Sequence, residues 1–182
     1  MRFARHHSTW DEPISTDYHG VTLWECPPNG QGLAALQLLN LLESFDLKAM
    51  GRESADFWHA FVEAKKLAFA DRARYYADPA FAKVPVDELL SKDYAKRRAA
   101  LIAMQRAALT DAPGDVTAID RRETTYLCTA DESGMMVSLI QSNYTGFGSG
   151  YVIPSLGFGL QDRGNLFDLR PDRPNSLVPG KR

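Results

Sequence analysis

Apolar residues recur at helical spacing in three stretches of the chain. In Leu33–Phe45, Leu36, Leu39 and Leu42 recur at helical spacing and Leu38 and Leu41 widen the apolar face, which predicts a helix buried nearly all round. Ser54–Asp78 predicts a long helix with Ser54 as its N-cap. Lys92–Met104 predicts a third helix, capped by Ser91. The apolar face of the long helix is expected to contain Phe57, Phe61, Ala64 and Ala68.

Strand-like segments occupy the two ends of the chain. Gly20–Cys26 is the clearest strand candidate before the helices. Thr124–Ala130 and Met135–Ser142 predict a β-hairpin, joined by the turn Asp131–Gly134. Cys128 lies in the middle of the first hairpin strand and is expected in the core. The chain is therefore helical first and rich in strands afterwards.

Proline and glycine mark the connections. Residues 78–90 contain two prolines and are expected to connect helices without forming one. Residues 110–123 have a loop composition. Pro27–Gly32 is expected to be a turn from strand to helix, and the alternative is that its backbone N–H groups shape a pocket. Gly146–Gly150 favours a packed turn over a phosphate loop.

Composition mainly excludes functions. The 21 basic and 23 acidic residues give a net charge of -2, and the basic cluster Ala95–Leu101 is typical of a solvated helix face, so no nucleic-acid partner is expected. Cys26 and Cys128 form no CxxC pair, and the histidines show no HExxH spacing, so we expect no metal and no cofactor. No apolar run approaches the ~20 residues of a membrane span. No apolar segment follows Met1 as it would in a signal peptide.

The hairpin opens on Thr124 and Thr125. β-Branched residues suit a strand start, which is one explanation of the pair. The other is that Thr124 is a latent nucleophile, which needs a base within hydrogen-bond reach. Cleavage of the Glu123–Thr124 bond would supply that base, because the new α-amine has a pKa near ~7.7–8.0. The base and the hydroxyl would then belong to one residue.

Three segments in this order resemble the gamma-glutamyltransferase family of N-terminal-nucleophile hydrolases: Pro27–Glu43, Phe69–Ile102 and Thr124–Gly150. The resemblance covers almost the whole chain. It implies an α/β (α+β) fold, the αββα sandwich, incomplete in this chain and made as a precursor that cleaves itself. Residues 1–123 would form the C-terminal part of the large subunit and residues 124–182 the N-terminal part of the small one, within one joint domain.

The resemblance also implies roles for individual residues. Thr124 would be the nucleophile, and the bond between Glu123 and Thr124 the cleavage site. Ser142 occupies the position of a family threonine that hydrogen-bonds the nucleophile. Tyr144 falls on a substrate-binding asparagine position, with Asn143 one place early.

Two positions depart from the transpeptidases. Leu166 replaces the acidic residue that holds the γ-glutamyl amine, and Arg163 replaces a glutamine. A buried ammonium needs a carboxylate, which Asp162 or Asp168 would have to supply from nearby. Arg163 is either a surface charge or, since arginine suits a carboxylate, a clamp for a substrate carboxylate. The chain therefore resembles an amidase-like branch of the family, with enzymes acting on oxamate or glutaryl-type amides.

The function implied is acyl transfer or amide hydrolysis. The expected partners are glutathione or another γ-glutamyl or small-acid amide, water or an amino-acid acceptor, and the paired large and small subunits. Family precursors are much longer than this chain, so we expect an internal fragment that is inactive alone. The alternative is an inactive remnant or a non-catalytic interaction fragment of the same fold. Cytoplasmic and periplasmic locations both remain open.

Overall fold

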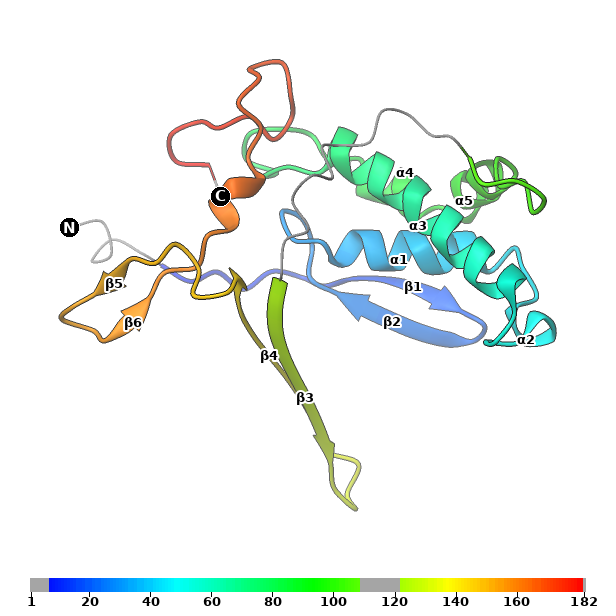
Figure 1. Ribbon diagram of the computed structural model, residues 1–182, viewed down its shortest axis with the longest axis horizontal. Helices are drawn as coiled ribbons and strands as arrows, with labels where there is room; N and C mark the ends of the chain where they lie inside the picture. Colours follow the sequence, from blue (N-terminus) through cyan, green and yellow to red (C-terminus); the bar gives the residue numbers. More distant parts are fainter. Residues whose placement is uncertain (1–6, 109–121, 182) are drawn as a thin grey trace. The chain divides into compact units, whose positions relative to one another are not determined.

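A computed structural model describes residues 7–108 and 122–181. Two compact units are present (Figure 1). The first comprises Met1–Asp111 with Asp168–Arg182, and the second comprises Ala112–Phe167. The expected loop at residues 110–123 lies outside the described residues as far as residue 121, and it is wrong for Arg122 and Glu123, which begin a strand.

Helices packed on a short hairpin form the first unit (Figure 1). The strands β1 (Ile14–Tyr18) and β2 (Val21–Glu25) pair antiparallel, with Ile14 opposite Glu25 and Tyr18 opposite Val21. The helices are α1 (Gly32–Leu42), α2 (Leu47–Met50), α3 (Ala55–Tyr75), α4 (Val86–Leu90) and α5 (Lys92–Ala99). The predicted strand at Gly20–Cys26 and the turn that follows it are confirmed, because β2 leads through Pro27–Gln31 into α1.

The long helix α3 starts where the sequence predicts. The Ser54 hydroxyl accepts a hydrogen bond from the Phe57 N–H at 3.1 Å, which satisfies one of the free amides of the first turn. Ala64 and Ala68 are fully buried as expected, whereas Phe57 and Phe61 are half-buried. The predicted face is therefore confirmed at its two alanines.

Two helix predictions need correction. Pro85 does not exclude a helix but precedes one, as the N-cap residue of α4. Proline is tolerated at a helix start because the amide it lacks would have no partner there. The third helix, α5, ends at Ala99 and not at Met104. The amides of Leu101 and Ile102 bond to carbonyls three residues back, which tightens and ends the helix.

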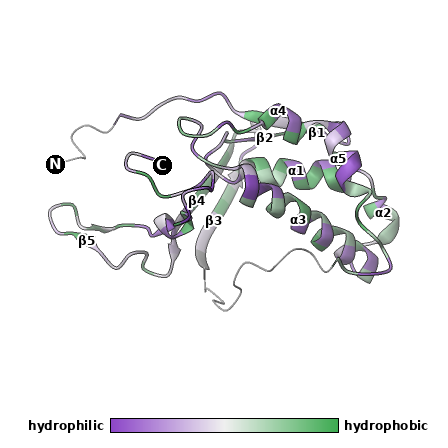
Figure 2. Ribbon diagram, turned by 90° about the horizontal axis from the view of Figure 1, so that it is seen from above, coloured by the Kyte–Doolittle hydropathy of each residue, from purple (hydrophilic) through white to green (hydrophobic). Residues whose placement is uncertain are grey.

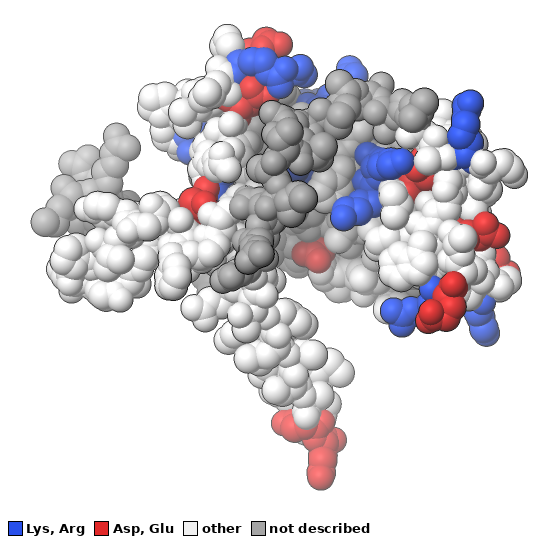
Figure 3. Space-filling model, viewed as in Figure 1, with Lys and Arg blue, Asp and Glu red and all other residues white. Residues whose placement is uncertain are grey.

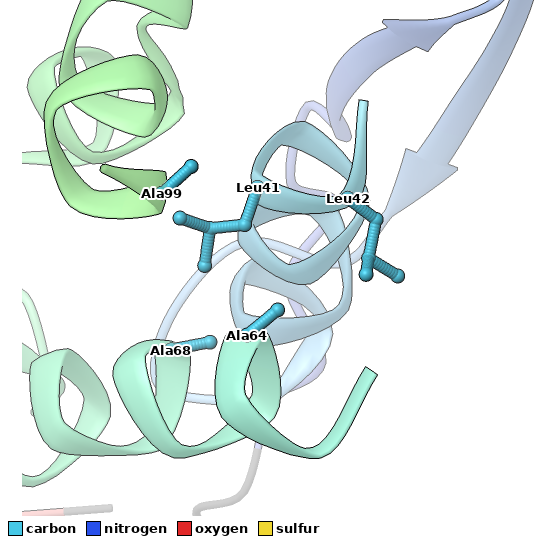
Figure 4. Close-up of a cluster of buried hydrophobic side chains, with 5 residues drawn as sticks. All are labelled: Leu41, Leu42, Ala64, Ala68 and Ala99. Carbon is cyan, nitrogen blue, oxygen red and sulfur yellow. The ribbon is translucent and has the colours of Figure 1, made fainter. Parts of the chain in front are cut away.

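The main hydrophobic cluster joins three helices. Leu41 and Leu42 of α1, Ala64 and Ala68 of α3 and Ala99 of α5 form this cluster. Figure 4 shows Leu41 directed to the side where Ala68 and Ala99 lie, and Leu42 on the opposite side of α1. Small side chains on α3 let the leucines pack closely, and a buried leucine contributes about 1.5–3 kcal/mol. Figure 2 shows the difference in composition: α1 is hydrophobic along most of its length, whereas α3 alternates.

Polar groups also lie inside this unit, and the sequence pattern did not indicate them. The Asp71 carboxylate accepts hydrogen bonds from Gln37 Nε2 at 3.1 Å and from Arg98 Nη2 at 3.0 Å. The Tyr76 hydroxyl donates to Gln37, and burial raises the pKa of Tyr76. Arg98 belongs to the basic cluster expected on a solvated face. That expectation is wrong for Arg98, which turns inward to pair with Asp71.

The second unit is built on the predicted β-hairpin. Strands β3 (Arg122–Ala130) and β4 (Met136–Thr145) pair antiparallel. They are followed by the short pair β5 (Val152–Ile153) and β6 (Phe158–Gly159), and by the 3-10 helix η2 (Arg163–Leu166). Figure 3 shows acidic side chains at the tip of the β3–β4 hairpin, where Asp131 and Glu132 lie, and uncharged side chains along the described part of the strands that leads to it, residues 124–130 and 136–145.

Cys128 is exposed, so the expectation that it lies in the core is wrong. The apolar side chains of Leu127, Leu139 and Ile140 are exposed as well. A two-stranded sheet has no second layer of its own to cover either face. Within the described ranges, none of the helices combines the length and apolarity that a membrane crossing requires.

Candidate active site

Thr124 lies at an irregularity of the hairpin. Glu123 pairs with Tyr144 and Thr124 pairs with Ser142, so the register shifts between Glu123 and Thr124 and leaves Asn143 as an extra residue on β4. Bulges of this kind re-aim side chains and are frequent beside active sites. The peptide bond expected to be cleaved is therefore the bond at which the ladder changes register.

Two hydroxyl groups meet across this bulge. Thr124 Oγ1 donates a hydrogen bond to Ser142 Oγ at 3.0 Å. Ser142 Oγ also accepts the Tyr144 N–H at 3.0 Å. Because that amide fixes the serine hydroxyl, the serine in turn fixes the orientation of the threonine hydroxyl. The structure thus brings together both residues that the resemblance assigns to catalysis.

Tyr144 has an unusual backbone. Its φ of 81° lies in the left-handed region, which a bulky side chain rarely adopts and which costs about 1–3 kcal/mol. Its side chain is buried, and the guanidinium of Arg163 lies over the ring with Cζ 5.8 Å from the centroid. Strain of this kind persists only where neighbouring groups hold it, and it is frequent at functional sites.

Arg163 reaches the same strand. Its Nη1 donates to the Ser142 carbonyl at 3.2 Å. A guanidinium has five N–H donors in a planar fork, so this bond uses one of them. Arg163 begins η2 and its side chain is exposed. The geometry therefore places a cationic group next to the bulge that carries Ser142 and Tyr144.

Asn143 is the residue that the bulge leaves unpaired. It is exposed, and its carbonyl accepts the Asp162 N–H at 3.2 Å. Its assignment to substrate binding stays a prediction. For Glu123 the structure describes the backbone position in β3, opposite Tyr144.

The two carboxylates considered as partners for a substrate amine both have protein partners. Asp162 accepts hydrogen bonds from the N–H and the hydroxyl of Thr145, and the hydroxyl bond is the main reason that its pKa is lowered. Asp168 is bound by Arg170, through Nε at 3.0 Å and Nη2 at 2.6 Å, which lowers the pKa of Asp168. Leu166, at the position of the family's acidic residue, is half-buried.

Sequence reasoning missed Thr145. It lies three residues after Ser142 but finds its partner 17 positions away, at Asp162. No local spacing predicts such a pair, and only the glycine-rich composition of the intervening residues hints that the chain turns back.

The glycine run 146–150 forms part of that return. Gly148 has a φ of +69°, and a Cβ built on it would lie 2.4 Å from the Leu160 carbonyl oxygen. The Ser149 N–H donates to the same oxygen at 2.9 Å. This close backbone contact supports the packed turn over the phosphate loop. Among the residues described, no three His, Cys, Asp or Glu side chains gather as metal ligands.

The chain is similar to known proteins along nearly its whole length. The family model for gamma-glutamyltranspeptidase matches residues 3–182. The chain is 38% identical over 180 residues to the glutathione hydrolase-like YwrD proenzyme of Bacillus subtilis (strain 168), covering 99% of this chain and 33% of that protein. It is 41% identical over 172 residues to the acylase ACY 1 proenzyme of Pseudomonas sp. (strain V22), covering 94% of this chain and 30% of that protein.

A solved structure also matches the chain. The crystal structure of cephalosporin acylase from Bacillus halodurans matches with a TM-score of 0.78 and 47% identity, covering 96% of this chain and 30% of that one. The chain thus spans about a third of the length of the curated relatives it matches. The predicted N-terminal-nucleophile fold, covered here in part, is confirmed. The curated relatives are named as hydrolase and acylase proenzymes, and the chain belongs to the gamma-glutamyltranspeptidase family.

Proposed function

We propose that Thr124 is the nucleophile of an amide hydrolase or acyltransferase that becomes active when the Glu123–Thr124 bond is cut. The observation that carries the proposal is the 3.0 Å hydrogen bond from Thr124 Oγ1 to Ser142 Oγ at the register shift of the hairpin. Residues 1–123 would then belong to a large subunit and residues 124–182 to a small one, and the two would stay paired.

Cleavage changes the chemistry of one residue. While the bond is intact, the nitrogen of Thr124 is an amide and cannot act as a base. Hydrolysis produces a carboxylate on Glu123 and an α-amine on Thr124, and about half of that amine is neutral at a pH equal to its pKa of ~7.7–8.0. The amine takes the proton of its own hydroxyl as the oxygen attacks the substrate carbonyl.

The reaction then proceeds through an ester. The bond formed joins Thr124 Oγ1 to the acyl carbon, and the bond broken is the amide C–N of the donor. The protonated α-amine gives its proton to the departing nitrogen. Water, or the amine of an amino acid, attacks the ester and restores the threonine. Once the threonine proton has moved to the amine, the Ser142 hydroxyl orients the nucleophile by donating its own hydrogen to Thr124 Oγ1.

The neighbouring charges favour a donor whose acyl group ends in a carboxylate. Arg163, stacked beside Tyr144, has the planar donors that bind a carboxylate in pairs. A free amine on the same acyl group would need a carboxylate, but Asp162 is engaged by Thr145 and the family's acidic position is Leu166. Glutaryl-type amides therefore fit better than γ-glutamyl ones. The relatives that are named acylases agree with this preference.

Mass spectrometry tests the nucleophile. The complete gene product that contains residues 1–182 is expected to separate into two species at the Glu123–Thr124 bond. Thr124→Ala should abolish that cut, whereas Thr125→Ala, at the adjacent threonine, should leave it intact. Cleavage that persists in Thr124→Ala would indicate an outside protease, and a single uncut wild-type species would favour a non-catalytic role.

Paired substrates test the acyl preference. Glutaryl p-nitroanilide and γ-glutamyl p-nitroanilide share the acyl carboxylate and differ in the α-amine. We expect a higher kcat/KM for the glutaryl compound, and Arg163→Ala should raise KM for both. Arg163→Lys keeps the charge but not the fork, and should recover part of the loss. A γ-glutamyl preference, or an Arg163→Ala enzyme with unchanged KM, would contradict the assignment.

A further inference from the structure

The segment Leu160–Arg163 lies along the end of β4 and the turn that follows it. The Asp162 N–H donates to the Asn143 carbonyl at 3.2 Å, and Arg163 Nη1 donates to the Ser142 carbonyl at 3.2 Å. Further along, the Leu160 carbonyl accepts the Ser149 N–H at 2.9 Å. The bulge that carries Ser142 is thus held from one side by a segment about twenty residues later in the chain.

Asp162 makes the most extensive of these contacts. Its Oδ1 accepts the Thr145 N–H at 3.1 Å, and its Oδ2 accepts the Thr145 hydroxyl. Together with the backbone bond to Asn143, three hydrogen bonds join this one residue to the two neighbours of Tyr144. The lowered pKa of Asp162 keeps the carboxylate charged and its bonds strong at neutral pH.

Tyr144 lies between those two neighbours. Its backbone is left-handed, with a φ of 81°, and this conformation directs its N–H to Ser142 Oγ at 3.0 Å. The same serine oxygen accepts the hydroxyl of Thr124. Hydrogen bonds at both ends and the backbone of residues 143–145 between them therefore connect the Asp162 carboxylate to the threonine.

We infer that Asp162 is a positioning residue of the threonine site: it clamps Thr145 and Asn143, holds Tyr144 in its left-handed conformation, and so keeps Ser142 in place against Thr124. The inference rests on the proposed function. It differs from a role in binding the substrate, since both carboxylate oxygens of Asp162 are directed to Thr145.

The hairpin offers a matched control. Asp131 forms a similar clamp at the opposite end of the same strands, where its Oδ1 accepts the Ser133 N–H at 2.9 Å, the Ser133 hydroxyl at 2.6 Å and the Met135 N–H at 3.1 Å. Hydrogen bonds within its turn also lower the pKa of Asp131. If such clamps only stabilise the hairpin, Asp131→Ala and Asp162→Ala should behave alike.

The experiment compares these variants in the complete gene product that contains residues 1–182. Asp162→Ala should slow both cleavage of the Glu123–Thr124 bond and kcat for glutaryl p-nitroanilide by about tenfold or more, with KM unchanged, because small misplacement of a reacting group is enough for such a loss. Asp131→Ala should leave both rates near wild type. Thr145→Ser keeps the hydroxyl and should retain the rates, whereas Thr145→Val should lose part of them.

Three outcomes would overturn the inference. Equal effects of Asp131→Ala and Asp162→Ala would make the clamp purely structural. A rise in KM at constant kcat would make Asp162 a binding residue. Wild-type rates in Asp162→Ala would make it dispensable.

Failure of the proposed function is recognised separately, since the wild type itself would then neither cleave nor turn over the anilide. In that case the rate of hydrogen exchange at the Thr145 amide tests whether Asp162 holds this segment, because that amide donates to the Asp162 carboxylate. Faster exchange in Asp162→Ala than in Asp131→Ala would show that the carboxylate holds the bulge. Equal exchange in the two variants would reject the clamp.

Discussion

Thr124 Oγ1 and Ser142 Oγ lie 3.0 Å apart, across the point where the hairpin changes register. The two residues are 18 positions apart in the chain and meet because Asn143 is inserted into β4 as a bulge. Without that extra residue, Thr124 would face a different position of the partner strand. The contact is therefore a consequence of strand register as much as of residue type.

Removing the Ser142 hydroxyl should slow cleavage of the Glu123–Thr124 bond. We expect Ser142→Ala to reduce the rate of cleavage at Thr124 by about tenfold, since one net hydrogen bond contributes about 0.5–1.5 kcal/mol and about 1.4 kcal/mol is tenfold in rate. Ser142→Thr, which keeps a hydroxyl, should retain most of the rate. Timed mass spectrometry of the precursor measures this.

Ser138 provides the control. It lies four residues earlier on β4, and its hydroxyl donates to the Tyr126 hydroxyl at 3.2 Å. Ser138→Ala removes a similar surface hydrogen bond from the same hairpin and should not change the cleavage rate. If Ser138→Ala and Ser142→Ala slow cleavage equally, the effect belongs to the hairpin and not to the site.

Gly148 and Gly150 share a backbone conformation but differ in surroundings. Their φ angles are +69° and +70°, yet a Cβ on Gly148 would lie 2.4 Å from the Leu160 carbonyl oxygen, whereas nothing lies within 4 Å of one on Gly150. Both alanine variants lose free energy of unfolding because alanine disfavours the left-handed backbone. Gly148→Ala should lose about 1–3 kcal/mol more of the free energy of unfolding, because it also forces two backbone segments apart.

Urea unfolding, monitored separately from activity, compares the two glycine variants. A smaller loss for Gly148→Ala than for Gly150→Ala would contradict the close contact with Leu160. Hydrogen exchange at the Ser149 amide, which bonds to the Leu160 carbonyl, should rise in Gly148→Ala.

The buried carboxylate of Asp71 should be sensitive to substitution. Asp71→Ala removes the carboxylate that pairs with Arg98 and accepts Gln37 Nε2 in a largely closed environment, and we expect a loss of about 3 kcal/mol in the free energy of unfolding. Asp56→Ala, on the exposed first turn of the same helix, removes only a favourable interaction with the helix dipole and should cost about 0.3–1 kcal/mol. Urea unfolding of both variants tests the difference, and equal losses would refute it.

Acid should weaken the attachment of Ala108 to α3. Glu63 is buried, and burial alone would raise the pKa of its carboxyl, but the hydrogen bonds from Lys66 and from the Ala108 N–H outweigh that effect and the pKa is lowered. A lowered folded-state pKa means that the stabilisation is complete above the ordinary value of 4.5 and is lost as the pH falls through the folded-state value.

The measurement is the free energy of unfolding from pH 7 to pH 3, in the wild type and in Glu63→Gln. The wild type should lose more stability below pH 4.5 than the variant does, because glutamine does not titrate. Identical slopes for the two proteins would show that Glu63 contributes nothing to the acid response.

Some features of this protein follow from local sequence. Leucine periodicity predicts α1, Ser54 marks the start of α3, and the alternating segments around Gly134 predict the β3–β4 hairpin. Each depends on residues within a few positions of one another, where side-chain spacing and backbone geometry are directly linked. The threonine pair at the strand start suggested Thr124, and the resemblance added Ser142 as its hydrogen-bond partner. Residue types alone do not say that the two hydroxyl groups meet.

Tertiary structure decided the rest. A polar residue such as Gln37 or Asp71 is buried because partners arrive from distant elements, and the same residue without them would lie in water. Likewise the bulge at Asn143, the left-handed Tyr144 and the clamp from Asp162 depend on a segment that returns after about twenty residues. Local sequence determines which backbone conformations are low in free energy. Long-range hydrogen bonds determine where a conformation of higher free energy, such as that of Tyr144, is nevertheless stabilised.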